Sequence, residues 1–243
     1  MGKGLTKAVL LGLVIVVSMM SWAQDVRTYV PTGAKRLAPI LVSCQAQIWP
    51  AAPAPWTLAG LVEAESCISL THSRCWNERA ELKTSREYGF GLGQITVTST
   101  LNNFDNLKAA HASLRTWEWD DRYNPNYQLI AIVEMNLGLW RKWASDPGAT
   151  VDDQWAFVLS SYNGGASGVM QDRLLCSNTK GCDKNKWFGN VETTSLKSKV
   201  PQPSYGGRSW YTINQTYVSD ILKLRRSKYQ TFWEHPDGNA CTR

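Results

Sequence analysis

The sequence predicts a mainly α-helical protein with one folded domain, and three observations lead to this expectation. Apolar residues make up 43% of the 243 residues and charged residues 19%, which allows a sizeable buried core and excludes wholesale disorder. Apolar side chains recur at helical spacing in several segments, whereas alternating segments typical of strands are few. No heptad array and no repeat of roughly 20–50 residues is visible, which excludes fibrous and solenoid classes.

The first 23 residues have the pattern of a secretory signal. A short basic stretch with Lys3 and Lys7 precedes an apolar run from Ala8 to Met20, and residues 21–23 (SWA) form a small-residue cleavage site. We expect cleavage directly after this site. An uncleaved membrane tether formed by residues 8–23 is the alternative, because the uncharged run reaches the lower edge of the roughly 17–25 residues that span a bilayer. In both cases the rest of the chain is exported.

The charge balance is mildly basic. The chain carries 26 Lys plus Arg against 20 Asp plus Glu, a net charge of +6, and without residues 1–23 the balance is 24 against 20, or +4. This charge suits an anionic wall or membrane surface, and ordinary solvated surface charge explains it equally well. No basic stripe or basic helix is present, so nucleic acid is not an expected partner. The three histidines are far apart and no Cys-x-x-Cys pair occurs, so no metal and no cofactor are expected.

All six cysteines lie in the exported part of the chain. An even number of cysteines in an oxidising compartment indicates disulfides, and six cysteines allow fifteen pairings. The short spacings favour Cys67–Cys75 and Cys176–Cys182, which leaves Cys44–Cys241 to join the two ends.

The first elements after the signal are a leader and a helix. Residues 24–55 are rich in Pro and Ala, which predicts an extended leader ahead of a folded domain over residues 56–243. Thr57 is expected to cap a helix that begins at about Leu58. Glu65 follows the apolar spacing of this helix and shares its apolar face, whereas Glu63 points elsewhere.

The remaining elements follow from apolar spacing and turn residues. A polar inserted loop is expected over 68–88, followed by a glycine-rich segment over 88–94 (YGFGLGQ) that suits close backbone approach rather than a regular element. A buried central helix follows over 126–143, and another helix runs from Asp152 or Asp153 to Gly164-Gly165. A long surface loop is expected over 180–209 and a C-terminal helix over 217–228.

A carboxyl group on an apolar helix face has a specific chemical use. Cleavage of a glycosidic bond requires a proton on the leaving oxygen, and a carboxyl group holds that proton at neutral pH only if burial raises its pKa. Glu65 is therefore the candidate catalytic acid. A buried Glu that pairs with Arg or Lys for structural reasons is the alternative.

Three short blocks occur in a fixed order along the chain. They are Glu65-Ser66, residues 85–94 (SREYGFGLGQ) and residues 161–165 (SYNGG). Their order resembles the lytic transglycosylase domain of the lysozyme superfamily, with a Glu-Ser pair, a Ser-x-x-Gly-x-x-Gly-Leu-x-Gln segment and an Ala-Tyr-Asn-x-Gly segment. Residues 89–92 are also similar to goose-type lysozymes. The chain departs from the pattern in a longer first gap and in Tyr88, Gly93 and Ser161.

The resemblance implies a lysozyme-like α-helical domain with a small irregular or β-containing region, which cleaves peptidoglycan glycan strands in the periplasm or cell envelope. Glu65 would act as acid and then as base, and the product would carry a 1,6-anhydroMurNAc end. The implied substrate-binding residues are Ser85, Phe90, Gly91, Gln94, Tyr162 and Asn163. Ser85 and Gln94 would bind substrate or brace the loop, the backbone of Phe90 and Gly91 would line the groove, Tyr162 would orient Glu65 or the sugar, and Asn163 would hold the local turn. Core packing is the alternative role of Tyr162.

Two other functions stay open at this point. A hydrolytic muramidase would use a second carboxylate, for which Glu78, Glu81 and Glu87 are candidates and Glu87 is nearest the glycine-rich segment. An inactive wall-binding module would bind sugar and release no fragments. Among the twelve tryptophans, Trp76, Trp117, Trp119 and Trp187 are candidates for stacking on sugar rings, whereas Trp140, Trp143 and Trp155 are expected in the core. A monomer is expected.

Overall fold

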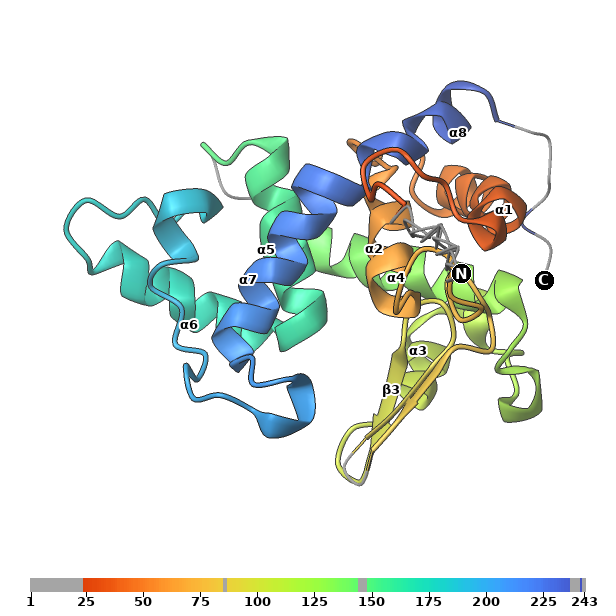
Figure 1. The fold of residues 1–243 in the computed structure, drawn as a ribbon, viewed down its shortest axis with the longest axis horizontal. Helices are drawn as coiled ribbons and strands as arrows, with labels where there is room; N and C mark the ends of the chain where they lie inside the picture. Colours follow the sequence, from red (N-terminus) through yellow and green to blue (C-terminus); the bar gives the residue numbers. More distant parts are fainter. Residues whose placement is uncertain (1–23, 85–86, 144–147, 237–240, 242–243) are drawn as a thin grey trace, which may run out of the picture.

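The structure is a computed structural model that describes residues 24–84, 87–143, 148–236 and 241 (Figure 1). The expected signal, its cleavage site and Ser85 lie outside the described residues. The described part is mainly helical with a small antiparallel sheet, so the predicted class is confirmed. The helices over Asn103–Ala110, Ala166–Ser177 and Gln230–Glu234 were not predicted, and neither was the helix over Thr32–Ile48.

The elements have the following bounds. The helices are α1 (Thr32–Ile48), α2 (Thr57–Ser66), α3 (Asn103–Ala110), α4 (Pro125–Trp143), α5 (Val151–Gly164), α6 (Ala166–Ser177), α7 (Trp210–Asp220) and α8 (Gln230–Glu234). The strands are β1 (Glu81–Lys83), β2 (Glu87–Phe90) and β3 (Ile95–Thr98). Short 3₁₀ or π turns are η1 (Ala112–Leu114), η2 (Trp119–Asp121), η3 (Trp187–Val191), η4 (Pro203–Tyr205), η5 (Ile221–Arg225) and η6 (Ser227–Tyr229).

Helix α4 is the centre of the hydrophobic core, as its apolar circumference predicts. Residues 129–133 are almost fully buried, and α1 and α5 pack against this helix. Helix α5 begins with a capping box, in which Thr150 and Asp153 satisfy each other's backbone N–H groups. Its last residue is Gly164, close to the predicted end.

The prediction of an extended leader is wrong over Thr32–Ile48, which form helix α1. Proline favours extended backbone locally, but Pro39 stands in the middle of this helix and is itself buried. The residues with helical spacing around it (Ala34, Leu37, Ala38 and Leu41) are fully buried in the common core. Burial of this apolar face outweighs the hydrogen bond that proline removes. Thr57 is also not a cap, because it is the first residue of α2 and its neighbour Trp56 occupies the cap position.

The prediction of an irregular segment over 68–94 is wrong in part, because the segment contains two of the three strands. The strand order is β1-β2-β3, and Tyr88 pairs with Lys83 on one side and Val97 on the other. The predicted close approach of the backbone to a neighbouring segment does occur in the turn after β2. Gly91 has a φ of +74°, and a Cβ there would lie 2.4 Å from the Gln128 side chain. The glycine-rich segment is thus half strand and half tight turn.

The three predicted disulfides, Cys44–Cys241, Cys67–Cys75 and Cys176–Cys182, are all present. They indicate an oxidising compartment and hence export. Within the described residues, no helix combines the length and the apolar character that crossing a bilayer requires.

Candidate active site

A cleft of about 570 Å³ opens between the end of α2, the sheet, the end of α5 and the start of α7. Five of its polar lining residues matter for the chemistry, namely Glu65, Arg74, Glu87, Gln94 and Tyr162. The other lining residues are Leu82, Gly89, Gly93, Ile95, Thr96, Asn103, Met135, Asn163, Gly164, Lys197, Ser198, Tyr205, Trp210, Ile213 and Asn214. Segments from both halves of the chain therefore form the walls.

Glu65 stands in the last turn of α2 and lines the cleft, partly buried. Burial raises the pKa of its carboxyl group from 4.5 to about 7. A hydrogen bond from the Tyr217 hydroxyl to Glu65 Oε1, 2.5 Å long, and the charge of Arg74 partly offset that rise in pKa. With a pKa of about 7, both the protonated and the ionised form of this cleft-lining carboxyl group are populated near neutral pH.

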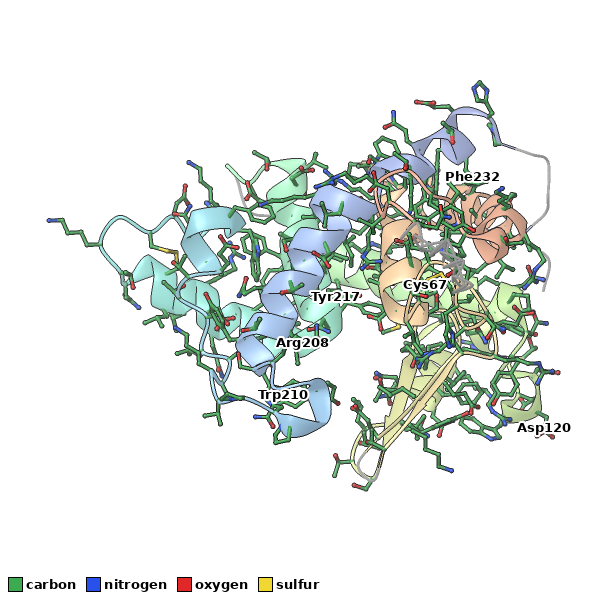
Figure 2. All side chains as sticks on the ribbon, viewed as in Figure 1. Cys67, Asp120, Arg208, Trp210, Tyr217 and Phe232 are labelled. Carbon is green, nitrogen blue, oxygen red and sulfur yellow. A yellow bond between two sulfur atoms is a disulfide. The ribbon has the colours of Figure 1, made fainter. Side chains whose placement is uncertain are left out.

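Two tyrosines accompany Glu65. Tyr162, from the last turns of α5, donates a hydrogen bond of 2.7 Å to the Gly93 carbonyl oxygen. Tyr217 lies on the side of α7 that faces α2 (Figure 2). Burial and the Glu65 carboxylate raise the pKa of both phenols, so both hydroxyls remain donors. Tyr162 was a predicted site residue, whereas Tyr217 was assigned only to a helix.

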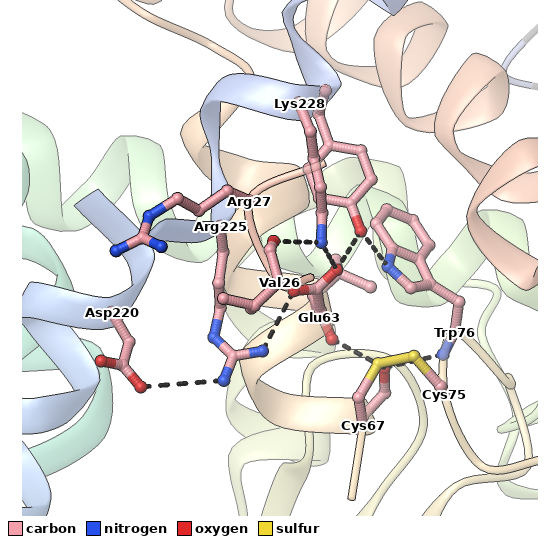
Figure 3. Close-up of polar contacts among 12 residues, drawn as sticks. Val26, Arg27, Glu63, Cys67, Cys75, Trp76, Asp220, Arg225 and Lys228 are labelled. Atoms are coloured by element: carbon pink, nitrogen blue, oxygen red, sulfur yellow. Dashed lines mark hydrogen bonds and ion pairs between the residues drawn. A yellow bond between two sulfur atoms is a disulfide. The ribbon is translucent and has the colours of Figure 1, made fainter. Parts of the chain in front are cut away.

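The prediction that Glu63 points away from the buried side of α2 is wrong. Glu63 is fully buried, and its carboxylate pairs with Arg225 at 3.0 Å and with Lys228 at 2.7 Å (Figure 3). Tyr229 donates a further hydrogen bond to Glu63 and accepts one of 3.0 Å from the Trp76 indole. The structural ion pair considered for Glu65 is therefore made by Glu63, two residues earlier, and fixes the back of α2.

The segment that follows Glu65 is held against α2. Ser66 Oγ donates to the Val62 carbonyl oxygen at 2.7 Å and accepts from the Trp76 backbone N–H at 3.0 Å. The Cys67–Cys75 disulfide closes this segment. Arg74 is thereby positioned at the cleft, where it affects Glu65 electrostatically without forming an ion pair within 4.0 Å among the described residues.

Gln94 braces the turn after β2. Its side-chain amide donates to the Gly91 carbonyl oxygen at 2.9 Å and to that of Ala80 at 3.2 Å, and its Oε1 accepts from Arg74 at 3.0 Å. Gln94 has a φ of +45°, a left-handed conformation that the contacts of its side chain maintain. The residue also lines the cleft, so bracing the loop and contacting a ligand are compatible roles.

Phe90 and Gly91 lie behind the cleft wall rather than on it. Phe90 is fully buried between Phe104, Trp117 and Trp119. The lining positions next to them are Gly89 and Gly93. Sequence reasoning missed Gln128, a fully buried residue of α4 that accepts from the Leu92 backbone N–H at 2.9 Å and so holds the turn.

Asn163 is exposed at the end of α5 and lines the cleft. Its Oδ1 accepts a hydrogen bond of 2.9 Å from Asn214 of α7. Asn214 is buried, and it also accepts from Ser160 at 2.7 Å. Asn163 thus belongs to a contact between α5 and α7 rather than to an isolated turn.

Of the three candidate second carboxylates, Glu87 lines the cleft. Its Oε1 accepts a hydrogen bond of 2.9 Å from Tyr205. Glu78 pairs instead with Arg36 at 2.6 Å, and Glu81 accepts from Tyr88 and Tyr123.

Most of the tryptophans are structural. Trp76, Trp117 and Trp187 are at most 1% exposed, so they do not offer a free face for a sugar. Trp119 is 40% exposed but lies outside the cleft lining. Trp140, Trp143 and Trp155 pack in or against the core as predicted. The tryptophan at the cleft is Trp210, at the start of α7, which is 39% exposed and was not predicted.

The described residues contain no group of three or more His, Cys, Asp or Glu side chains that is placed to hold a metal ion. Comparison of the sequence with protein-family models and with curated proteins finds no match.

Proposed function

We propose that this protein is an exported peptidoglycan lytic transglycosylase that acts in the periplasm or cell envelope. The single observation that carries the proposal is that the carboxyl group of Glu65 lines a cleft and has a pKa of about 7. The ordered resemblance of the segments around Glu65, Gln94 and Tyr162 to that family supports the same assignment.

In the proposed reaction, Glu65 first acts as an acid. It donates its proton to the oxygen that links C1 of MurNAc to the next GlcNAc, and the bond between C1 and that oxygen breaks with assistance from the neighbouring acetamido group. The carboxylate that remains accepts the hydrogen bond from Tyr217, which stabilises its charge.

Glu65 then acts as a base. The carboxylate takes the proton of the C6 hydroxyl while O6 forms the new bond to C1. The product is a 1,6-anhydroMurNAc end, and Glu65 is protonated again, so no water is consumed. A carboxyl group with a pKa near neutrality suits both transfers, because neither the acid nor the base form is strongly disfavoured.

Glu87 supports a second candidate, a hydrolytic muramidase. It is a carboxylate in the same cleft as Glu65, and a second carboxylate is what a water-using mechanism requires. In the observed arrangement its Oε1 is engaged by Tyr205, which favours the first proposal.

The test combines a variant with product analysis. Glu65→Gln should lower peptidoglycan cleavage by about 10²–10⁴-fold, the usual contribution of a general acid. Its thermal unfolding is the control for folding. Above pH 7 the variant should be at least as stable as the wild type, because it buries no charge at this position.

Mass spectrometry of the digest separates the three functions. Anhydro ends that weigh one water less than reducing ends support the transglycosylase, and reducing ends support the hydrolase. A wild-type protein that binds peptidoglycan and releases no fragments would instead be a wall-binding module. Full activity of Glu65→Gln would contradict both enzymatic assignments.

A further inference from the structure

Two arms of the molecule project on either side of the cleft. One is the β1–β2 hairpin, which contributes Leu82 and Glu87 to the lining. The other is the segment 192–209, which contributes Lys197 and Tyr205. In Figure 1 both arms extend toward the same side of the molecule, away from the helical core.

The tip of the second arm is a closed turn. Its base is held by a bridge between Pro201 and Ser209 and by a hydrogen bond of 3.0 Å from the Gln202 N–H to the Arg208 carbonyl oxygen. The Tyr205 ring packs edge-on against Trp210, with 4.8 Å between ring centroids. Tyr205 is thus presented by a defined turn whose base is anchored at α7.

The two arms touch across the cleft. The Tyr205 hydroxyl donates a hydrogen bond of 2.9 Å to Glu87 Oε1, although the residues are 118 positions apart in the sequence. Both residues line the same cleft as Glu65. The contact joins parts of the two arms that both line the cleft, so a strand that enters between the arms from the side has to separate Tyr205 from Glu87.

We propose that Tyr205 and Glu87 form a clasp that makes the protein cleave glycan strands from their ends. This inference rests on the proposed glycan cleavage and specifies where along a strand the cuts are made. A linear strand enters a bridged cleft by its end, so cuts fall near that end and release short fragments. Opening of the clasp admits the middle of a strand. Since a hydrogen bond to a carboxylate shifts such an equilibrium by roughly tenfold, Tyr205→Phe should raise the ratio of internal to terminal cuts about tenfold.

The experiment compares the full-length wild type with Tyr205→Phe on purified sacculi. Two quantities are followed together, the mean length of the remaining glycan strands and the amount of soluble disaccharide-peptide. The wild type should release fragments while the mean strand length falls slowly. Tyr205→Phe should shorten the strands early, with more internal cuts per fragment released. Tyr211→Phe, a tyrosine of α7 outside the cleft lining, is the matched control and should behave as the wild type does.

Glu87→Ala tests the clasp from the other arm. This variant should shift cleavage to internal bonds, as Tyr205→Phe does. Complete loss of cleavage would instead identify Glu87 as a catalytic group and overturn the clasp proposal. Equal ratios of internal to terminal cuts in the wild type and Tyr205→Phe would also overturn it, and would leave the proposed function intact. No cleavage by the wild type would overturn both proposals.

Discussion

Glu63 and Glu65 lie on the same helix, and their different surroundings assign them different roles. Glu63 forms ion pairs with two cations in the interior and accepts a hydrogen bond from a phenol. Glu65 faces a cleft and accepts its hydrogen bond from a neutral phenol. Burial without an ion pair favours the protonated form of a carboxyl group and raises the pKa of Glu65 to about 7. The surroundings of Glu65 therefore provide a proton donor near neutral pH.

The pH dependence of cleavage should report Glu65. Because the acid form starts the proposed reaction, kcat/KM should fall with rising pH around a midpoint of about 7. Tyr217→Phe removes a hydrogen bond that lowers the pKa of Glu65, so the midpoint should move to higher pH. The measurement is the rate of release of soluble fragments between pH 5 and pH 10, with Tyr211→Phe as the control.

A midpoint that is the same in Tyr217→Phe would show that the phenol does not act on Glu65. A lower rate without a change of midpoint would assign Tyr217 a packing role.

The sequence predicted the residue at the centre of the site but not its partners. Helical spacing placed Glu65 on the apolar face, and the same spacing was read wrongly for Glu63, because a buried ion cluster has no periodic signature. Tyr217 had been assigned only to the predicted C-terminal helix. What it contacts depends on the packing of α7 against α2, which no local pattern encodes.

At the scale of elements, the placement of α2 depends on the buried cluster at its back. Arg225 comes from η5 and Lys228 from η6, so the cluster joins α2 to the C-terminal segment. Lys228 also donates a hydrogen bond of 2.8 Å to the Val26 carbonyl oxygen, which ties the first described residues to the same point (Figure 3). The C-terminal segment and the first described residues therefore meet behind α2.

Glu63→Gln should destabilise the protein strongly. It removes the negative charge and leaves the Lys228 side chain, which is 2% exposed, without its ion-pair partner. Breaking a buried pair in this way costs about 3–5 kcal/mol, which is roughly 10 °C in the melting temperature at this chain length. Thermal unfolding followed by circular dichroism measures the effect. The matched control is Glu78→Gln, which breaks the more exposed pair with Arg36 and should cost less than about 1 kcal/mol.

A loss as small as that of the control would mean that the cluster does not hold α2. Cleavage activity measured below the unfolding transition separates the stability effect from any displacement of Glu65.

The elements differ in how far local sequence determines them. Helix α4 is predictable from its apolar spacing, and helix α5 because apolar spacing, a capping box and terminal glycines agree. Helix α1 is not predictable from local sequence. Its proline-rich composition indicates extended backbone and its apolar spacing indicates a helix, and burial in the tertiary structure decides between them. The three short strands are stabilised by pairing with one another, so their individual sequences carry little signal.

At the scale of the whole molecule, one disulfide links helix α1 near the start of the described chain to Cys241 near its end. Cys44 of α1 bonds to Cys241 across a sequence separation of 197. The Trp233 indole of α8 adds a hydrogen bond of 2.8 Å to Gln45 beside it. This pairing was predicted from the cysteine spacing alone, because the two short-range pairs left no other partners.

Loss of this bond should lower stability more than loss of a short-range one. In the chain-entropy view, a cross-link over a separation of 197 contributes about 5 kcal/mol and one over a separation of 6 about 2 kcal/mol. The comparison is between Cys44→Ala with Cys241→Ala and Cys176→Ala with Cys182→Ala, each measured by urea unfolding. Equal losses would indicate that native-state contacts, rather than the unfolded chain, set the contribution of the long-range bond.

The long-range bond also has a consequence for how the chain matures. When a polypeptide is translocated N-terminus first, Cys44 meets the oxidant together with Cys67 and Cys75, long before Cys241 emerges. Oxidation in the order of emergence would join Cys44 to Cys67, and the native bonds then require that this bond be reopened by thiol–disulfide exchange. Production of this protein should accordingly depend on a disulfide isomerase, and refolding yields from the reduced chain should rise in a glutathione shuffling buffer.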